Sequence, residues 1–274
     1  MTDTSTTPAA PGAPSPIAAL PNLRDLGGWI GADGRVVKYG LLFRSTDFRS
    51  VAADAESALS PLGLRTIYDL RSAAERSATP DPKLQGVADV SLDVLADEKT
   101  AIPGNLDKFL TDPETVAEVS HELSEKGPEL IEGTYRGFIT LGSATSSYRS
   151  FYRGLLGEKQ TPALFHCTTG KDRTGWAAAS FLSLMGVSRT DVYDDYLLTN
   201  SRLLPALAPV FDKFAAAGGD PAALRPLLGV DRTYLDAAFA QLEESYGTVE
   251  DYFAKSLGID HAEQQVLRDR YLAG

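Results

Sequence analysis

A lone cysteine is followed six residues later by an arginine, in the segment HCTTGKDRTG that spans residues 166–175. A thiolate is a strong nucleophile, and a guanidinium offers a planar fork of donors that fits two phosphate oxygens. Residues 162–165 have the pattern of a buried strand, and residues 175–185 that of a buried helix. A loop that closes on a helix N-terminus can turn its N–H groups toward an anion. The segment therefore predicts a phosphate-binding loop with Cys167 as nucleophile.

The residue types around Cys167 suit phosphoryl transfer. A helix N-terminus favours the thiolate, and cysteines so placed have pKa values of about 3.5–7.5. We expect Arg173 to hold the phosphoryl group as it flattens in the transition state, and Gly170 to permit the tight turn. Thr174 is expected to donate a hydrogen bond to the cysteine sulfur, and His166 to order the loop backbone. The expected phosphate-binding residues are Thr168, Thr169, Gly170, Lys171, Asp172 and Arg173.

Two carboxyl groups are candidates for the acid that protonates the leaving group. Asp172 lies within the loop, and Asp93 ends the apolar run of residues 87–94. We favour Asp172, although a loop carboxylate can also simply pair with Lys171 or a backbone N–H. Asp93 stays open as the alternative, with a solvated turn residue as its simpler interpretation.

Other charged residues are candidates for the substrate pocket. Lys171 can contact a second phosphate or a substrate carboxylate, or merely offset Asp172. For the remaining candidates a structural ion pair is the competing interpretation, and Arg71 has the helical i,i+4 spacing to Glu75. The candidate pocket residues are Arg24, Asp25, Arg71 and Arg136.

Composition excludes several other classes of protein. The net charge of −11 disfavours nucleic acid as a partner, because nucleic acid binding needs a cationic footprint. One cysteine and three unpaired histidines predict neither disulfides nor a metal site, and we expect no cofactor. A nucleotide P-loop is excluded because Gly170-Lys171 is followed by Asp172 and position 165 is not glycine. No apolar run of 18 residues is present, so no integral membrane association is expected.

The elements that must position this loop form an α/β pattern. Residues 31–34 suggest a hairpin turn followed by an extended segment over 35–44, and short apolar runs at 64–70 and 86–94 predict further strands. Helices are expected over 113–156, with breaks near Gly127-Pro128 and Gly142, and over most of 191–272, with Asp231, Thr248 and Asp260 as N-caps. Residues 1–16, rich in Thr, Ala and Pro, are expected to be a flexible tail without signal-peptide features, ahead of one domain over 17–274.

The loop and several further segments resemble the atypical bacterial tyrosine phosphatases that carry an HCxxGKDRTG loop. The resemblance covers most of residues 20–272. The loop is also similar to that of eukaryotic phosphoinositide phosphatases, which have a lysine at the position of Lys171. The further segments are residues 22–28, 42–45, 69–72 with Glu75, 135–136, 195–197 with Asn200, 234–235 and 246–247.

The resemblance implies a tyrosine phosphatase fold, with a central, mostly parallel sheet flanked by helices and a helical lid, which we place at about residues 203–228. It implies hydrolysis of phosphotyrosine, with phosphoserine, phosphothreonine and phosphoinositides as further candidate substrates, and an acid or base role for Asp172. The absence of a signal peptide favours a cytoplasmic location, although the family includes proteins exported without one. A phosphate-binding module without turnover, an arsenate reductase and a sulfurtransferase are the competing functions. An arsenate reductase commonly needs resolving cysteines, which this chain lacks.

Overall fold

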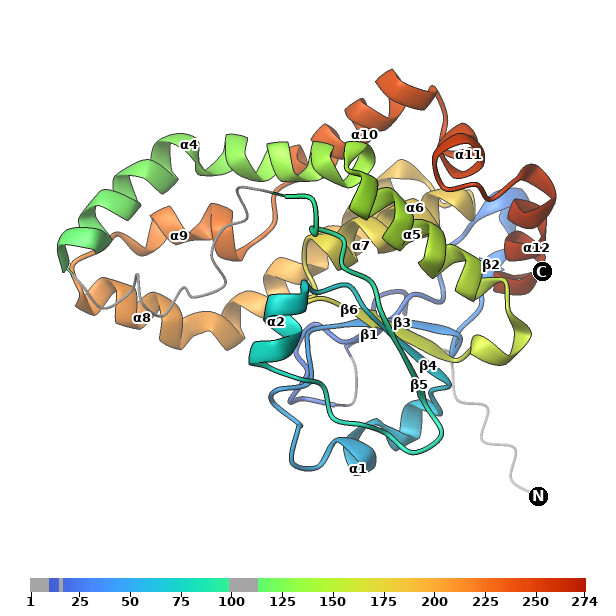
Figure 1. Ribbon diagram of the computed structural model, residues 1–274, viewed down its shortest axis with the longest axis horizontal. Helices are drawn as coiled ribbons and strands as arrows, with labels where there is room; N and C mark the ends of the chain where they lie inside the picture. Colours follow the sequence, from blue (N-terminus) through green and yellow to red (C-terminus); the bar gives the residue numbers. More distant parts are fainter. Residues whose placement is uncertain (1–9, 15–16, 99–112) are drawn as a thin grey trace.

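A five-stranded, mostly parallel sheet forms the centre of the computed structural model (Figure 1). The structure describes residues 10–14, 17–98 and 113–274, and for 113–125 the backbone alone. The strand order is β1-β3-β6-β4-β5, in which β1 pairs antiparallel with β3 and the other neighbours pair in parallel. The predicted mostly parallel sheet is therefore confirmed. Its strands are β1 (Arg24–Asp25), β3 (Leu42–Ser45), β4 (Thr66–Asp69), β5 (Ala88–Ser91) and β6 (Ala163–His166).

Apolar side chains on both faces of the sheet are buried. Successive residues of a strand point to opposite faces, so Tyr68 and Phe165 pack in the main core while Ile67 and Leu164 pack in a second core. The main core is formed with the large helical layer, and the second core with the N-terminal segment and the short helix α1 (Ala55–Leu59). The central strands thus have the two buried faces typical of a parallel sheet.

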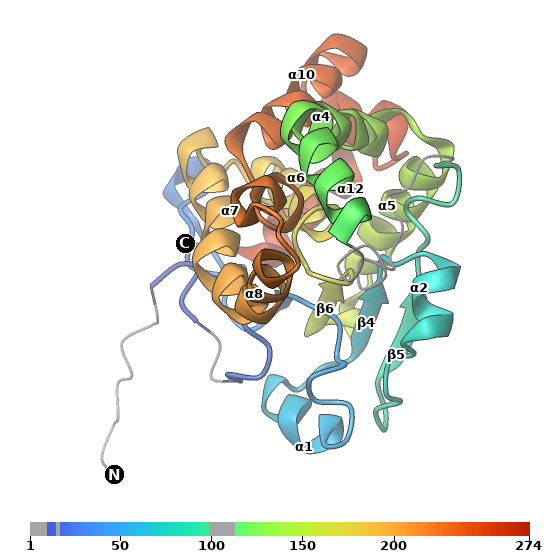
Figure 2. The same ribbon diagram turned by 90° about the vertical axis from the view of Figure 1, so that its left-hand side faces the viewer.

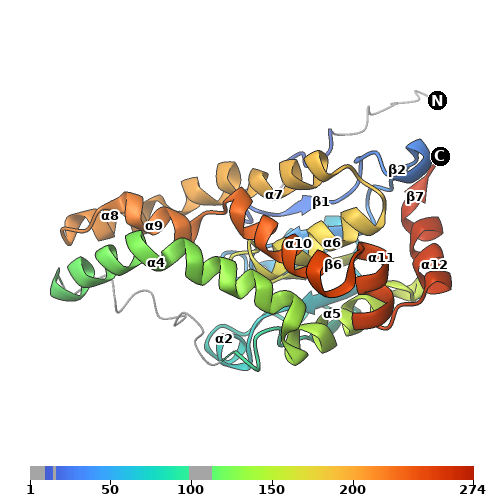
Figure 3. The ribbon, with the colours of Figure 1, turned by 90° about the horizontal axis from the view of Figure 1, so that it is seen from above.

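Most helices lie on the side of the sheet that holds the main core, as Figure 3 shows from above. Residues 252–256 continue α11 as a π-helical turn. The helices after α1 are α2 (Ala73–Ala78), α4 (Pro113–Thr140), α5 (Gly142–Leu155), α6 (Arg173–Leu184), α7 (Arg189–Leu203), α8 (Ala208–Ala216), α9 (Pro221–Leu228), α10 (Arg232–Tyr246), α11 (Val249–Asp251) and α12 (His261–Tyr271).

The strand register brings three loops together at one edge of the sheet. In the pairing of β3, β6 and β4, His166 lies opposite both Ser45 and Asp69. The segments that follow these three strands therefore start side by side at the carboxyl edge. Cys167 is the residue after β6, so the predicted loop lies at the centre of this edge, where α/β proteins commonly bind ligands.

Helices α4, α8 and α9 extend together beyond the sheet, at the left of Figure 1 and toward the viewer in Figure 2. The pair α8 and α9 has a small core of its own, which contains Phe214, Leu224 and Leu228, and α9 packs against α4. The predicted helix break at Gly127-Pro128 is wrong, since α4 runs through Pro128. Packing of α4 against α9 and α10 outweighs the lost backbone hydrogen bond. The break near Gly142 is confirmed, with Leu141 as the N-cap of α5.

The opening and closing segments of the chain differ in part from the prediction. Residues 35–44 contain two strands separated by a turn, and β2 (Val36–Val37) pairs with β7 (Leu272–Ala273) at the end of the chain. A partner so distant in sequence leaves no local signal. The predicted N-caps are confirmed: Asp231 accepts from the N–H of Thr233, Thr248 from that of Asp251, and Asp260 forms a capping box with Glu263.

Part of the expected tail contacts the body of the protein. Residues 1–9 and 15–16 lie outside the described residues, whereas within 10–14 the carbonyls of Gly12 and Ala13 accept hydrogen bonds from Arg202 on α7. No helix among the described residues is both long enough and apolar enough to cross a bilayer.

Candidate active site

Residues 167–172 form a loop whose carbonyls face outward. Asn22 Nδ2 donates to the carbonyls of Thr169 (3.2 Å) and Gly170 (3.0 Å), and Arg44 Nη2 donates to the latter as well (2.9 Å). The N–H of Asp47 donates to the carbonyl of Thr168 (3.1 Å). By contrast, the N–H groups of residues 168–172 make no hydrogen bond to any other described residue. With the carbonyls held from outside, these donors are free for an anion at the N-terminus of α6.

Gly170 makes the tight course of the loop possible. Its φ is +66°, in the left-handed region that favours glycine. A Cβ at this position would lie 2.2 Å from the carbonyl oxygen of Ser45 and 2.9 Å from the N of Thr46. These are backbone atoms of the neighbouring strand end, so a side chain cannot be accommodated unless the loop moves.

A buried triad of charged residues contacts the loop through Arg44, which donates to the carbonyl of Gly170. Asp195 on α7 accepts from Arg24 Nε (2.8 Å) and from Arg44 Nη1 (2.8 Å), and all three side chains are almost fully buried. Burial alone would raise the pKa of Asp195, but the two guanidiniums hold it below its ordinary value. Burial lowers the pKa of Arg44 to about 10. Arg24, a candidate pocket residue, is therefore committed to this triad and to Asn22.

Arg173 is held by Glu75, at the third residue of α2. Its Nη1 lies 2.6 Å from Glu75 Oε2 and its Nη2 2.8 Å from Oε1, while Thr168 Oγ1 donates to the same carboxylate (2.5 Å). Despite burial, these partners hold the pKa of Glu75 well below its usual range. No hydrogen bond from Arg173 Nε to another described residue occurs, so the Nε–Nη2 edge can still grip an oxyanion.

The prediction of a helical i,i+4 ion pair between Arg71 and Glu75 is wrong. Ser72 is the N-cap of α2, so Arg71 precedes the helix and the spacing rule does not apply. Arg71 instead contacts Asp69 (2.8 Å) and Asp81 (2.6 Å), which leaves Glu75 to Arg173. The S-x-x-E pattern of residues 72–75 predicts the capping box, but it gives no indication of this second role.

The two acid candidates have different surroundings. Asp172 Oδ1 accepts from the hydroxyl of Tyr135 (3.0 Å), and its Oδ2 lies 3.1 Å from Lys171 Nζ. Asp93 Oδ2 accepts from the N–H of Ala73 at the start of α2 (2.8 Å). Asp172 is itself the N-cap residue of α6, so both carboxyl groups lie at a helix N-terminus. Asp172 differs from Asp93 in lying within the loop itself.

Lys171 links the loop to the end of α9. Its side chain is buried, and its Nζ donates to the carbonyl of Gly229 (3.0 Å) as well as approaching Asp172. In this conformation the ammonium group is engaged inside the protein. The loop thus meets the residue that directly follows α9 at a defined hydrogen bond.

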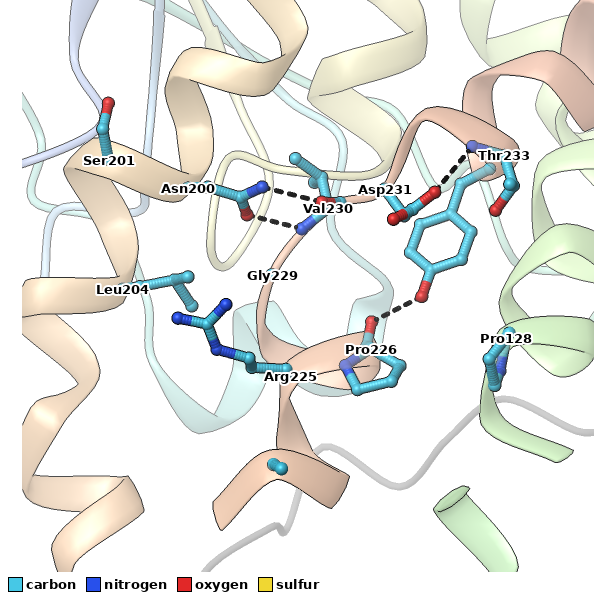
Figure 4. Close-up of a pocket in the computed structure, with 12 residues that line it drawn as sticks. Pro128, Asn200, Ser201, Leu204, Arg225, Pro226, Gly229, Val230, Asp231 and Thr233 are labelled. Atoms are coloured by element: carbon cyan, nitrogen blue, oxygen red, sulfur yellow. Dashed lines mark hydrogen bonds between the residues drawn. The ribbon is translucent and has the colours of Figure 1, made fainter. Parts of the chain in front are cut away.

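A cavity of about 730 Å³ lies beside that hydrogen bond (Figure 4). Asn200 brackets one wall, donating to the carbonyl of Val230 and accepting from its N–H, each at 2.8 Å, while Tyr234 donates to Pro226 (3.2 Å). No residue of the loop lines this cavity. Its other lining residues come from α4, α7, α9 and α10 and the segments that join them.

His166 and Thr174 flank the nucleophile and both are buried. His166 Nδ1 lies 3.1 Å from the carbonyl of Cys167, which fits the expected ordering of the backbone, and its Nε2 lies 3.1 Å from Asp81 Oδ2. Thr174 Oγ1 makes no hydrogen bond to any described residue, so the expected contact with the sulfur is not formed in this conformation.

The remaining pocket candidates do not contact the loop within the described structure. Arg136 pairs with Glu132 one helical turn earlier (3.2 Å) and is partly exposed. Asp25 accepts from the N–H groups of Gly27 (2.8 Å) and Gly40 (2.6 Å). Burial raises the pKa of Asp25, although these two N–H groups act in the opposite direction. Both residues are in positions that suit structural roles.

A group of possible metal ligands lies behind the loop. Ligand-type atoms of Asp69, Asp81 and His166 lie within 4.8 Å of one another. The guanidinium of Arg71 contacts both carboxylates, as described above, and already supplies the positive charge that a cation would bring. These residues therefore form an ion-pair network that fits poorly with a metal.

Comparisons with known proteins find matches along most of the chain. The model of the family described as "Tyrosine phosphatase family" matches residues 15–273. A protein of Cupriavidus necator named a tyrosine-protein phosphatase is 31% identical over 269 residues, which cover 93% of this chain and 87% of that protein. The triple specificity protein phosphatase PtpB of Mycobacterium tuberculosis is 27% identical over 251 residues, which cover 81% of this chain and 87% of PtpB. The solved structure of P. aeruginosa TpbA shares 18% identity over 73% of this chain and 96% of TpbA, but the TM-score of 0.28 is too low to bear on fold or function.

Proposed function

Because the chain belongs to the tyrosine phosphatase family, a family of cysteine-dependent enzymes, we propose that it hydrolyses protein phosphotyrosine through a phosphocysteine formed on Cys167. The observation that carries the proposal is the loop itself. Asn22, Arg44 and Asp47 donate to its outward carbonyls, and within the described part of the chain its N–H groups have no partner beside the nucleophile. A loop with inward N–H groups of this kind can bind the equatorial oxygens of a phosphoryl group.

In the first step the Cys167 thiolate attacks phosphorus. The P–S bond forms while the bond from phosphorus to the tyrosine oxygen breaks, and the departing phenolate takes the proton of Asp172. Arg173 and the loop N–H groups stabilise the charge on the transferring phosphoryl group. Glu75 contributes by holding the guanidinium of Arg173 end-on, which directs its other edge toward the substrate.

In the second step water hydrolyses the phosphocysteine. The Asp172 carboxylate accepts a proton as the water oxygen attacks phosphorus, and the P–S bond breaks to regenerate the thiolate and release inorganic phosphate. Asp172 is thereby reprotonated for the next cycle. We assign the acid and base role to Asp172 over Asp93 because Asp172 lies in the loop, whereas Asp93 contacts the N–H of Ala73 on α2.

Phosphotyrosine is the first choice of substrate. A second phosphate, as in a phosphoinositide, would have to draw Lys171 away from Gly229 and Asp172, where it is buried. The name of PtpB assigns triple specificity to that relative, which is a reason to test phosphoserine, phosphothreonine and phosphoinositides here as well. We place the lid at residues 203–228, a proposal supported by the separate small core of α8 and α9.

The decisive test is hydrolysis of p-nitrophenyl phosphate by the wild type and by Cys167→Ser, between pH 5.5 and 7 with EDTA present. We expect turnover by the wild type alone, and then a higher kcat/KM for phosphotyrosine peptides than for phosphoinositides. If neither protein turns over while both bind phosphate, the chain is a binding module. Turnover that EDTA abolishes would instead indicate a metal-dependent reaction.

A further inference from the structure

Two buried tyrosines on the helices form a chain of hydrogen bonds that ends at Asp172. Tyr135, on α4, has its hydroxyl 3.0 Å from Asp172 Oδ1, and the hydroxyl of Tyr196, on α7, lies 2.6 Å from that of Tyr135. Both side chains are almost fully buried. Neither residue is part of the phosphate loop, yet their hydroxyls form a continuous chain that ends on the proposed acid.

The direction of this chain follows from counting protons. A hydroxyl has one hydrogen to donate, and an ionised carboxylate can only accept. Tyr135 therefore donates to Asp172, and Tyr196 donates to the oxygen of Tyr135. Burial, assisted by the charge of Asp172, raises the pKa of both tyrosines well above the ordinary value, so both remain protonated donors at neutral pH.

Ring packing fixes where the two hydroxyl oxygens lie. The rings of Tyr135 and Tyr196 meet edge to face with centroids 6.2 Å apart, and Phe138 lies against Tyr135 at 5.0 Å. Gly175 lets α6 approach closely, since a Cβ there would lie 3.0 Å from Tyr196 Cε2. The hydroxyl chain is thus held by packed helices, which suits the positioning of a reactive group.

We infer that Tyr135 and Tyr196 are positioning residues for general acid catalysis by Asp172. The terminal torsion of an aspartate is broad, so an untethered carboxyl group can rotate away from the leaving oxygen. Tyr135 occupies Oδ1 and leaves Oδ2 to carry the proton that the leaving group receives. Lys171 lies on the Oδ2 side, 3.1 Å away, and must yield when Oδ2 is protonated. Neither tyrosine transfers a proton itself, and both act through Asp172.

The inference rests on the proposed function. Its test is whether the effect of each tyrosine substitution on kcat/KM depends on the leaving group of the substrate. We would compare Tyr135→Phe and Tyr196→Phe with wild type on phenyl phosphate, a poor leaving group, and on 2,4-dinitrophenyl phosphate, a good one. Tyr135→Phe is expected to lower kcat/KM about tenfold for phenyl phosphate and less than about twofold for the dinitrophenyl ester. General acid catalysis as a whole contributes a factor of about 10²–10⁴ to the rate, and loss of positioning should remove only part of that factor. Tyr196→Phe should show the same selectivity with a smaller loss.

A double-mutant cycle separates positioning from a merely structural role. In the Asp172→Asn background, Tyr135→Phe should have no further effect on kcat/KM, because the group it orients is gone. Tyr152→Phe is the matched control: Tyr152 is also fully buried, but its hydroxyl bonds to Ala177 and Ser180. This control should leave the ratio between the two substrates unchanged.

Equal losses on both esters, or additive losses with Asp172→Asn, would overturn the inference. If Tyr135→Phe fails to fold, Tyr196→Phe interrupts the same chain one bond further away and carries the test. Failure of the proposed function itself would look different, since the wild type would then not hydrolyse even the dinitrophenyl ester.

Discussion

At the residue scale, Gly170 is a position where the phosphate-binding loop cannot accommodate a side chain. Its φ of +66° and the nearby carbonyl of Ser45 both exclude a side chain. Gly170→Ala is expected to displace the loop and to lower kcat/KM at least about 100-fold, because catalytic groups tolerate little misplacement. The measurement is hydrolysis of p-nitrophenyl phosphate alongside a thermal melt.

Gly63 provides the matched control for this substitution. Its φ is +58°, yet a Cβ there would meet nothing within 4 Å. Gly63→Ala should therefore cost only the left-handed backbone penalty, about 1–2 kcal/mol of stability, and keep full activity. Loss of activity in both variants to the same degree would show that backbone strain, and not contact with the neighbouring strand, is the cause.

Asp172 and Asp93 are also distinguished at this scale. Asp172→Asn should lower kcat/KM for phenyl phosphate about 100-fold, and for 2,4-dinitrophenyl phosphate only a few-fold, because a good leaving group needs no proton. Asp93→Asn should weaken the start of α2 without this selectivity, since its carboxylate accepts from Ala73. The opposite pattern in the two variants would transfer the acid role to Asp93.

At the element scale, the short helix α2 carries a residue with two functions. Glu75 completes the capping box with Ser72 and also holds Arg173. Glu75→Gln retains a side chain able to cap the helix, but it removes the charge that fixes the guanidinium. We expect a loss of about 1.5–3 kcal/mol in the free energy of unfolding and a roughly tenfold lower kcat/KM.

The stability contribution of Glu75 depends on pH in a definite direction. Its pKa is lowered in the folded state, so the contribution is complete above the unfolded pKa of about 4.3 and declines as the pH falls toward the folded pKa. Urea denaturation at pH 7 and pH 3 should therefore show a smaller difference between wild type and Glu75→Gln at pH 3. Glu243→Gln, at an exposed pair with Arg189, should cost at most about 1 kcal/mol at pH 7. A pH-independent difference for Glu75→Gln would contradict the charge pairing.

At the scale of the whole molecule, Asp195 joins α7 to the sheet and the loop. Arg24 belongs to β1 and Arg44 to β3, and the latter also donates to Gly170. Asp195→Asn would leave two buried guanidiniums without a counter-charge, at a cost of about 3–5 kcal/mol. The free energy of unfolding and kcat/KM should fall together, because the triad supports the loop.

Asp194→Asn is the control for the triad, since Asp194 is exposed on the same helix. It should change the free energy of unfolding by less than about 0.5 kcal/mol. A comparably small effect of Asp195→Asn would mean that the triad contributes little to stability.

The sequence by itself determined the family and the outline of the fold, and it predicted the chemistry of the loop. Cys167, Gly170 and Arg173 lie within seven residues, so their cooperation depends on local chain geometry that a motif can encode. The flanking strand, the helix α6 and three helix N-caps also depend on local periodicity and on hydrogen bonds between near neighbours, and each was found where predicted.

Only the tertiary structure decided which distant charges meet. Glu75 contacts Arg173, which is 98 positions away in the sequence, and Tyr135 contacts Asp172 from another helix. Glu75 and Tyr135 lie in segments that resemble the family, but the resemblance does not indicate these contacts. Arg24 likewise has the charge of a pocket residue, but the fold buries it against Asp195. Ion pairs and hydrogen bonds of this kind have no periodic signal in the sequence, because their partners are chosen by the packing of whole elements.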